Sequence, residues 1–114
     1  MEKREIPPAT ARRFADIGEA LGGRGIVVSQ MFGMPWLKVG GKAFAGVFGS
    51  SMVFKLEGDA HAGALKLKGT ELFDPSGMGR AMKEWVIVPA TPARRWMDLA
   101  GLASDYVSPA LPTR

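Results

Sequence analysis

The sequence predicts one α+β domain in which helices pack on an antiparallel sheet, and three features support this fold class. Within residues 31–56, MFGMPWLKVGGKAFAGVFGSSMVFKL, apolar runs are separated by Gly40-Gly41 and by Gly49-Ser50. Two tight turns in succession are typical of a three-stranded antiparallel meander. Residues 73–89 add a Gly-rich loop and a Trp-Val-Ile-Val strand that ends at proline. Amphipathic segments on both sides of these blocks predict the helices.

The first helix is expected over residues 9–21, after Pro7-Pro8. Its apolar residues Phe14, Ile17 and Leu21 follow an i, i+3, i+7 spacing, and Gly22-Gly23 supplies the end. Residues 26–39 then predict a first strand with a break or bulge near Gly33 and Pro35. A longer hairpin loop is the alternative there, and it would divide this segment into two strands.

Two-residue turns would set the register of the next strands, with Val39 opposite Lys42 and Phe48 opposite Ser51. Simple alternation then assigns two faces, both of them apolar. One face would carry Met34, Trp36, Ala43, Ala45, Val47, Met52, Phe54 and Leu56. The other would carry Leu37, Val39, Phe44, Phe48 and Val53, with Lys42 and Lys55.

Helices cover only one face of the sheet in a two-layer fold, so the second apolar face needs another partner. We therefore expect a homodimer, or a second protein docked on that face. The alternatives are a helix on each face, or a different turn length that shifts the register.

The C-terminal half predicts a helix from Asp59, as its N-cap, to Lys68, two strands at residues 70–73 and 84–88, and a last helix that Thr91-Pro92 opens. The apolar stripe of that last helix is Trp96, Leu99, Ala103 and Tyr106 or Val107. The predicted order is α-β-β-β-α-β-β-α, with one further strand if residues 26–39 divide.

Composition indicates a small cytoplasmic protein without cofactors. The 114 residues contain 46% hydrophobic residues, enough for one core, which we expect over residues 9–107 with residues 108–114 as a frayed tail. The absence of cysteine excludes disulfides and thiol catalysis, and the single histidine argues against a metal site. The N-terminal segment lacks the apolar core of a secretory signal, and no apolar run reaches the roughly 20 residues needed to cross a membrane.

Several elements together resemble the N-terminal domain family of TfoX, the bacterial competence regulator. The resemblance covers roughly residues 14–103, and its most specific parts are Met31-Phe32-Gly33, the strand Gly41-Lys42-Ala43-Phe44-Ala45, and the segment from Gly79-Arg80-x-Met82 to Val88-Pro89. It implies a two-layer α+β fold similar to secretion chaperones and a regulatory role. It implies no catalytic or ligand-binding residues.

Two departures limit what the resemblance implies. The full-length regulators have a second, C-terminal domain, whereas this sequence stops at Arg114. Met34-Pro35-Trp36 stands where the family usually has a second glycine after Phe-Gly, and this bulky, rigid segment could reshape the first hairpin or an adjoining groove.

Candidate chemistry is sparse. Glu57, Asp59 and His61 have i, i+2, i+4 spacing, but at a helix start this pattern is more simply capping and solvated charge. Residues 77–80, Gly-Met-Gly-Arg, invite an anion-binding interpretation, yet they lead into a strand and lack a dinucleotide spacing, which favours a hairpin loop. Trp36, beside Pro35, is the best candidate for an exposed functional aromatic residue.

The sequence thus favours a non-catalytic regulatory domain that acts through protein association, as a homodimer. The predicted contact residues are Leu37, Val39, Phe44, Phe48 and Val53. The alternative is a weak nucleic-acid-binding module, because the net charge is +4 and dispersed basic residues can converge on phosphates. The basic residues in question are Arg12, Arg13, Arg80, Lys83, Arg94 and Arg95.

Overall fold

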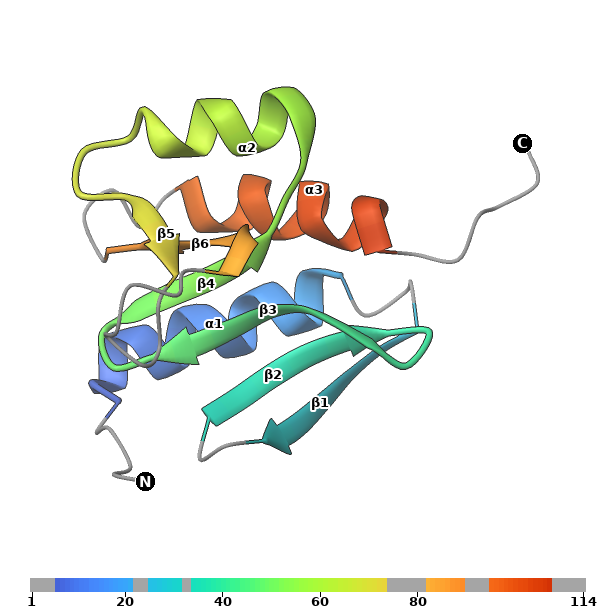
Figure 1. Ribbon diagram of the computed structural model, residues 1–114. Helices are drawn as coiled ribbons and strands as arrows, with labels where there is room; N and C mark the ends of the chain where they lie inside the picture. The colour runs from blue at the N-terminus through green and yellow to red at the C-terminus, as the bar shows by residue number, and fades with distance from the viewer. Residues whose placement is uncertain (1–5, 22–24, 32–33, 74–81, 90–94, 108–114) are drawn as a thin grey trace.

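The computed structural model describes residues 6–21, 25–31, 34–73, 82–89 and 95–107, and it has the α+β class that the sequence predicts (Figure 1). Residues 26–39 divide into two strands, so the further strand that the sequence left open is present. In chain order the elements are α1 (Pro8–Ala20), β1 (Ile26–Met31), β2 (Met34–Val39), β3 (Lys42–Phe48), β4 (Ser51–Lys55), α2 (Gly58–Leu65), β5 (Glu71–Phe73), β6 (Met82–Val88) and α3 (Trp96–Val107).

The strands form one antiparallel sheet in the order β1-β2-β3-β4-β6-β5. Both predicted turn registers are confirmed, because Val39 pairs with Lys42 and Phe48 pairs with Ser51. The β2–β3 turn has φ values of 58° at Gly40 and 81° at Gly41. A two-residue hairpin turn of this kind needs two left-handed residues, which explains the glycine pair.

A β-bulge in β3 changes which side chains face the helices. Lys38 pairs with Ala43, but the next pair is Leu37 with Ala45, so Phe44 is an additional residue on its strand. Phe44 and Ala45 are consecutive and both have 0% of their surface exposed in the core beneath the helices. The bulge therefore interrupts the simple alternation of faces.

All three helices contribute to a core on one face of the sheet, and Figure 1 shows α1 and α3 on the same side of it. Phe14 and Ile17 of α1 and Leu99 and Ala103 of α3 belong to this core together with apolar residues of β2, β3, β4 and β6. Trp96, at the start of α3, is 1% exposed in the same core. Among the described residues, no helix is long and apolar enough to span a membrane.

The opposite side of the sheet, called the open face below, has a second apolar cluster to which none of the described helices contributes. Its residues are Trp36, Val53 and Phe73, which are buried, and Met34, Ala43, Phe48, Trp85 and Ile87, which are partly buried.

The face assignment made from simple alternation was wrong for three of the five predicted contact residues. Leu37, Val39 and Phe44 lie under the helices, where Leu37 and Phe44 have no exposed surface. The bulge at Phe44 is the physical reason, because it turns the inward residues of β2 toward the helices. Phe48 and Val53, in contrast, lie on the open face as expected.

The helix boundaries agree with the sequence at α1 and differ at α2. Pro8 occupies the first turn of α1, as its missing N–H allows. Asp59 is not the N-cap of α2: that position belongs to Glu57, without a side-chain capping bond, and Gly58 follows it. The predicted opening of the last helix at Thr91-Pro92 lies outside the described residues.

Gly46 is expected to tolerate no larger residue. A Cβ atom there would lie 2.6 Å from Cε3 of Trp36, and Trp36 is itself held edge-to-face by Trp85, with ring centroids 5.3 Å apart. Gly46→Ala should lower the free energy of unfolding, measured by urea denaturation, by about 1–3 kcal/mol through overpacking. The control is Gly63→Ala in α2, where a Cβ meets nothing within 4 Å and should stabilise the helix by about 0.5–1 kcal/mol. Equal effects at the two positions would contradict this packing.

Substitution of Phe44 tests the corrected face assignment. Because Phe44 is fully buried beneath the helices, Phe44→Asp should abolish folding and Phe44→Ala should cost about 3–5 kcal/mol of unfolding free energy. Leu102→Ala in α3, at a side chain 46% exposed, should change stability by less than about 0.5 kcal/mol. If Phe44→Asp instead gave a folded monomer, judged by circular dichroism and light scattering, the burial of Phe44 beneath the helices would be contradicted.

Candidate functional site

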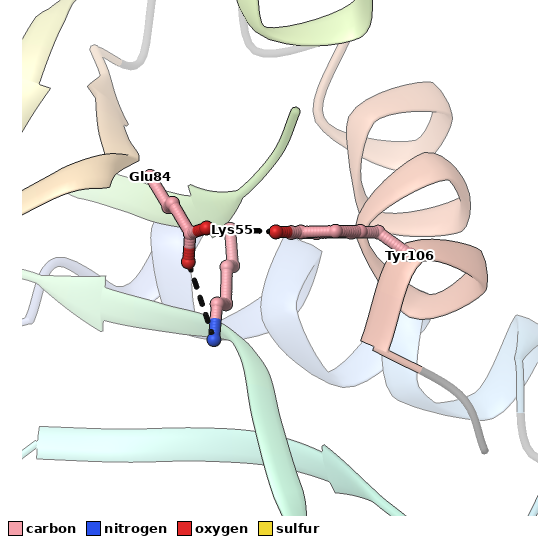
Figure 2. Close-up of polar contacts among 3 residues, drawn as sticks. All are labelled: Lys55, Glu84 and Tyr106. Atoms are coloured by element: carbon pink, nitrogen blue, oxygen red, sulfur yellow. Dashed lines mark hydrogen bonds and ion pairs between the residues drawn. The ribbon is translucent and has the colours of Figure 1, made fainter. Parts of the chain in front are cut away.

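A polar cluster connects the last turn of α3 with the sheet. Lys55 is the last residue of β4, Glu84 lies on β6, and Tyr106 is next to the last residue of α3. The Tyr106 hydroxyl donates a hydrogen bond of 2.8 Å to Oε2 of Glu84, and Nζ of Lys55 lies 3.5 Å from Oε1 of the same carboxylate (Figure 2). The Glu84 carboxylate thus accepts a hydrogen bond from a residue of α3 and forms an ion pair with a residue of the neighbouring strand β4.

The electrostatics of this cluster move the pKa values of Glu84 and Tyr106 further from neutral pH, in opposite directions. The hydrogen bond from Tyr106, followed by the charge of Lys55, lowers the pKa of Glu84 below its ordinary value. The same hydrogen bond to the Glu84 carboxylate raises the pKa of Tyr106 above its ordinary value. A general acid or base works best with a pKa near the operating pH. These shifts instead favour a constitutive contact between helix and sheet.

The sign of the pH dependence follows from the two shifts. The lowered pKa of Glu84 gives stability that is present above its unfolded value and is lost as the pH falls through its folded value. The raised pKa of Tyr106 gives stability that is present below its unfolded value and is lost as the pH rises through its folded value. The contact should therefore persist across neutral pH, although solvent screens it because both side chains are accessible.

The acidic residues around His61 do not assemble a metal site. Glu57 caps α2, Asp59 lies in its first turn, and the backbone N–H of His61 donates to the Glu57 carbonyl at 3.3 Å. Within the described segments, no group of three His, Cys, Asp or Glu side chains could hold a metal ion. This part of α2 is accounted for by helix geometry.

Three of the six residues proposed to bind phosphate lie in the described ranges with their side chains: Arg12, Arg13 and Arg95. Arg12 and Arg13 are exposed on α1, and Arg95 is exposed just before α3, with its Nε 3.8 Å from Oδ2 of Asp98. Arg80, with the loop at residues 77–80, and Arg94 lie outside the described residues, as does the side chain of Lys83. The described arginines thus come from two elements, and Arg95 has an intramolecular acidic neighbour.

Trp36 is not the exposed aromatic residue that the sequence indicated. Only 6% of its surface is accessible, because its ring covers Gly46 and meets Trp85 edge-to-face. A second edge-to-face pair joins Phe48 and Phe73, with ring centroids 5.2 Å apart. Two aromatic pairs therefore build the open face, and its accessible part consists of the partly buried apolar residues at their margins.

The outer strand β1 is the surface that reasoning from the sequence missed. It ends the sheet on one side, and Val27 and Val28 are 60% and 58% exposed. Successive residues of a strand point to opposite faces, so both sides of β1 present an apolar side chain to solvent. The signal was available in the uncharged run Ile-Val-Val-Ser-Gln-Met, but its position at the sheet edge was not.

Comparison with known protein families, with curated proteins and with solved structures finds no match for this chain. The resemblance to the TfoX N-terminal domain family stays a prediction from the residues that carry it.

The only tyrosine of the chain gives a direct measurement of the polar cluster. We expect absorbance at the tyrosinate band to titrate with a pKa above the ordinary value of 10.0, because the Glu84 carboxylate disfavours ionisation of Tyr106. Glu84→Gln should return this pKa toward the ordinary value, since the negative charge is removed. Glu71→Gln, on an exposed carboxylate of β5, is the control and should leave the titration unchanged. An ordinary pKa in the unmodified protein would contradict the hydrogen bond.

Proposed function

We propose that this chain is a non-catalytic, regulatory protein-association domain that acts as a homodimer. One observation carries the proposal: the described helices pack against a single face of a six-stranded sheet. The open face, with its aromatic pairs, and the exposed valines of β1 lie outside this helical layer. Val27 and Val28 are 60% and 58% exposed, whereas Trp36, Val53 and Phe73 of the open face are buried and the rest of that cluster is partly buried. The apolar surface that is accessible at β1 and at the margins of the cluster favours association with another protein surface.

The chemistry of the described residues supports a binding role over a catalytic one. The polar cluster has shifts that hold Glu84 charged and Tyr106 neutral, so neither group is prepared to exchange protons at neutral pH. The resemblance to the TfoX N-terminal domain family points the same way, toward a cytoplasmic bacterial regulatory domain. The described arginines favour phosphate binding less, because Arg12 and Arg13 lie on α1 whereas Arg95 precedes α3 and its Nε lies 3.8 Å from Oδ2 of Asp98.

The oligomeric state tests this proposal. Light scattering and sedimentation equilibrium at micromolar concentration should give twice the 12.2 kDa mass of one chain, because apolar surface outside the helical layer favours self-association. The apparent mass should persist at high salt, since apolar contacts are not screened as charge contacts are. A monomer under these conditions would exclude the homodimer.

A matched binding measurement separates protein association from phosphate binding. Fluorescence anisotropy with labelled DNA and RNA should show no salt-sensitive binding, and Arg12→Ala with Arg13→Ala should leave the signal unchanged. Binding that weakens steeply with salt would instead support the nucleic-acid alternative.

A further inference from the structure

The two edges of the sheet differ in how they are protected. At one end, β5 has three residues and begins with a charged side chain, Glu71. A short, charged edge strand is a common protection against pairing with another chain. At the other end, β1 has six residues, with neither a charge nor a proline.

The backbone of β1 is also regular enough to act as a template. All six of its residues, from Ile26 to Met31, pair with β2 without a register shift. The bulge of this sheet region lies one strand further in, between β2 and β3, so it does not distort the outer edge. An edge strand leaves alternate N–H and C=O groups directed away from its only neighbour, ready to accept another strand.

We propose that β1 pairs in antiparallel fashion with β1 of a second copy, so that the two sheets become continuous. This inference rests on the homodimer proposed above and specifies its contact surface. Two six-residue strands paired in this way would share roughly six backbone hydrogen bonds. Val27 and Val28 would gain cross-strand apolar neighbours on the two faces of the joined sheet.

If the chain forms the homodimer proposed above, its charge distribution favours β1 as the contact surface. Each copy carries a net charge of +4, so two copies repel each other over most contact surfaces. Because β1 contains no charged residue, antiparallel self-pairing places no like charges opposite each other within the strand pair.

Symmetry then determines how the two copies face. A two-fold axis that relates antiparallel edge strands within one sheet must be perpendicular to that sheet. The helical layers of both copies would lie on one side, and both open faces would lie together on the other. The dimer would thus present one extended open face, and the aromatic pairs of each copy would contribute to it.

The test uses the absence of cysteine from the chain. Single cysteines replace each of the residues at positions 27 to 30, and mild oxidation is applied to each full-length variant and to equimolar mixtures of variants two positions apart, because a two-fold axis perpendicular to the sheet lets only residues on the same face lie opposite each other. Facing residues in an antiparallel pair have Cα atoms about 4.5–5.5 Å apart, within the range that a disulfide spans. In an antiparallel pair of identical strands, the residue numbers of any two facing positions add up to the same total. We therefore expect crosslinked dimer only for those pairs of positions that give one such total. Leu102→Cys, at an exposed site on α3, is the control and should stay uncrosslinked.

A second pair of variants measures the contribution of the strand to affinity. Val27→Lys combined with Val28→Lys should keep the fold, because both side chains are exposed, and should weaken dimerisation at least about tenfold by placing positive charges near each other. Met97→Lys with Leu102→Lys adds the same charge on exposed positions of α3 and should leave the dimer intact.

The outcomes separate this inference from the homodimer itself. Crosslinks in one register together with loss of the dimer in the β1 lysine variant would support pairing through β1. A dimer that persists in that variant and forms no β1 crosslinks would overturn the edge pairing but leave the homodimer standing. A monomeric unmodified protein would overturn both.

Discussion

The additional residue in β3 decides the arrangement of the whole domain. Because Phe44 is inserted between Ala43 and Ala45, one strand turns two consecutive side chains toward the helices, and the inward residues of β2 change with it. Leu37 and Val39 thereby join the core beneath α1 and α3, while Trp36 turns to the open face. The division of apolar residues between the two faces thus depends on one local irregularity of backbone pairing.

The apolar cluster of the open face includes a close contact that leaves no space for a side chain at Gly46. Trp36 lies over Gly46 of the adjacent strand, where the absence of a Cβ atom allows the indole ring to approach the backbone. Trp85 then holds that ring from β6, on the far side of β4. Strands that are not neighbours in the sheet are therefore connected through side chains as well as through the backbone ladder.

Outside the core, the polar cluster of Lys55, Glu84 and Tyr106 links the end of α3 to the sheet. It complements the apolar contacts of Trp96 at the other end of the same helix. A helix held at both ends gives the sheet one stable covered side. The apolar cluster of the open face and the β1 edge lie outside this layer of described helices.

Reasoning from residues identified the α+β class, the order of elements and the two glycine-containing turns, because each depends on local geometry: glycine permits left-handed backbone, and apolar spacing reports a helix or a strand. It could not locate the bulge, since pairing with β2 decides which residue of β3 is additional. For the same reason it assigned six residues to the wrong face: Leu37, Val39, Phe44, Met34, Trp36 and Ala43. Nor could it identify β1 as the unprotected edge, because the order of strands in a sheet arises from contacts distant in sequence. The sequence by itself determined the elements and the apolar character of both sheet faces. Only the tertiary structure decided which apolar residues the helices bury and which remain at a surface, because burial depends on strand pairing and helix packing across the whole chain.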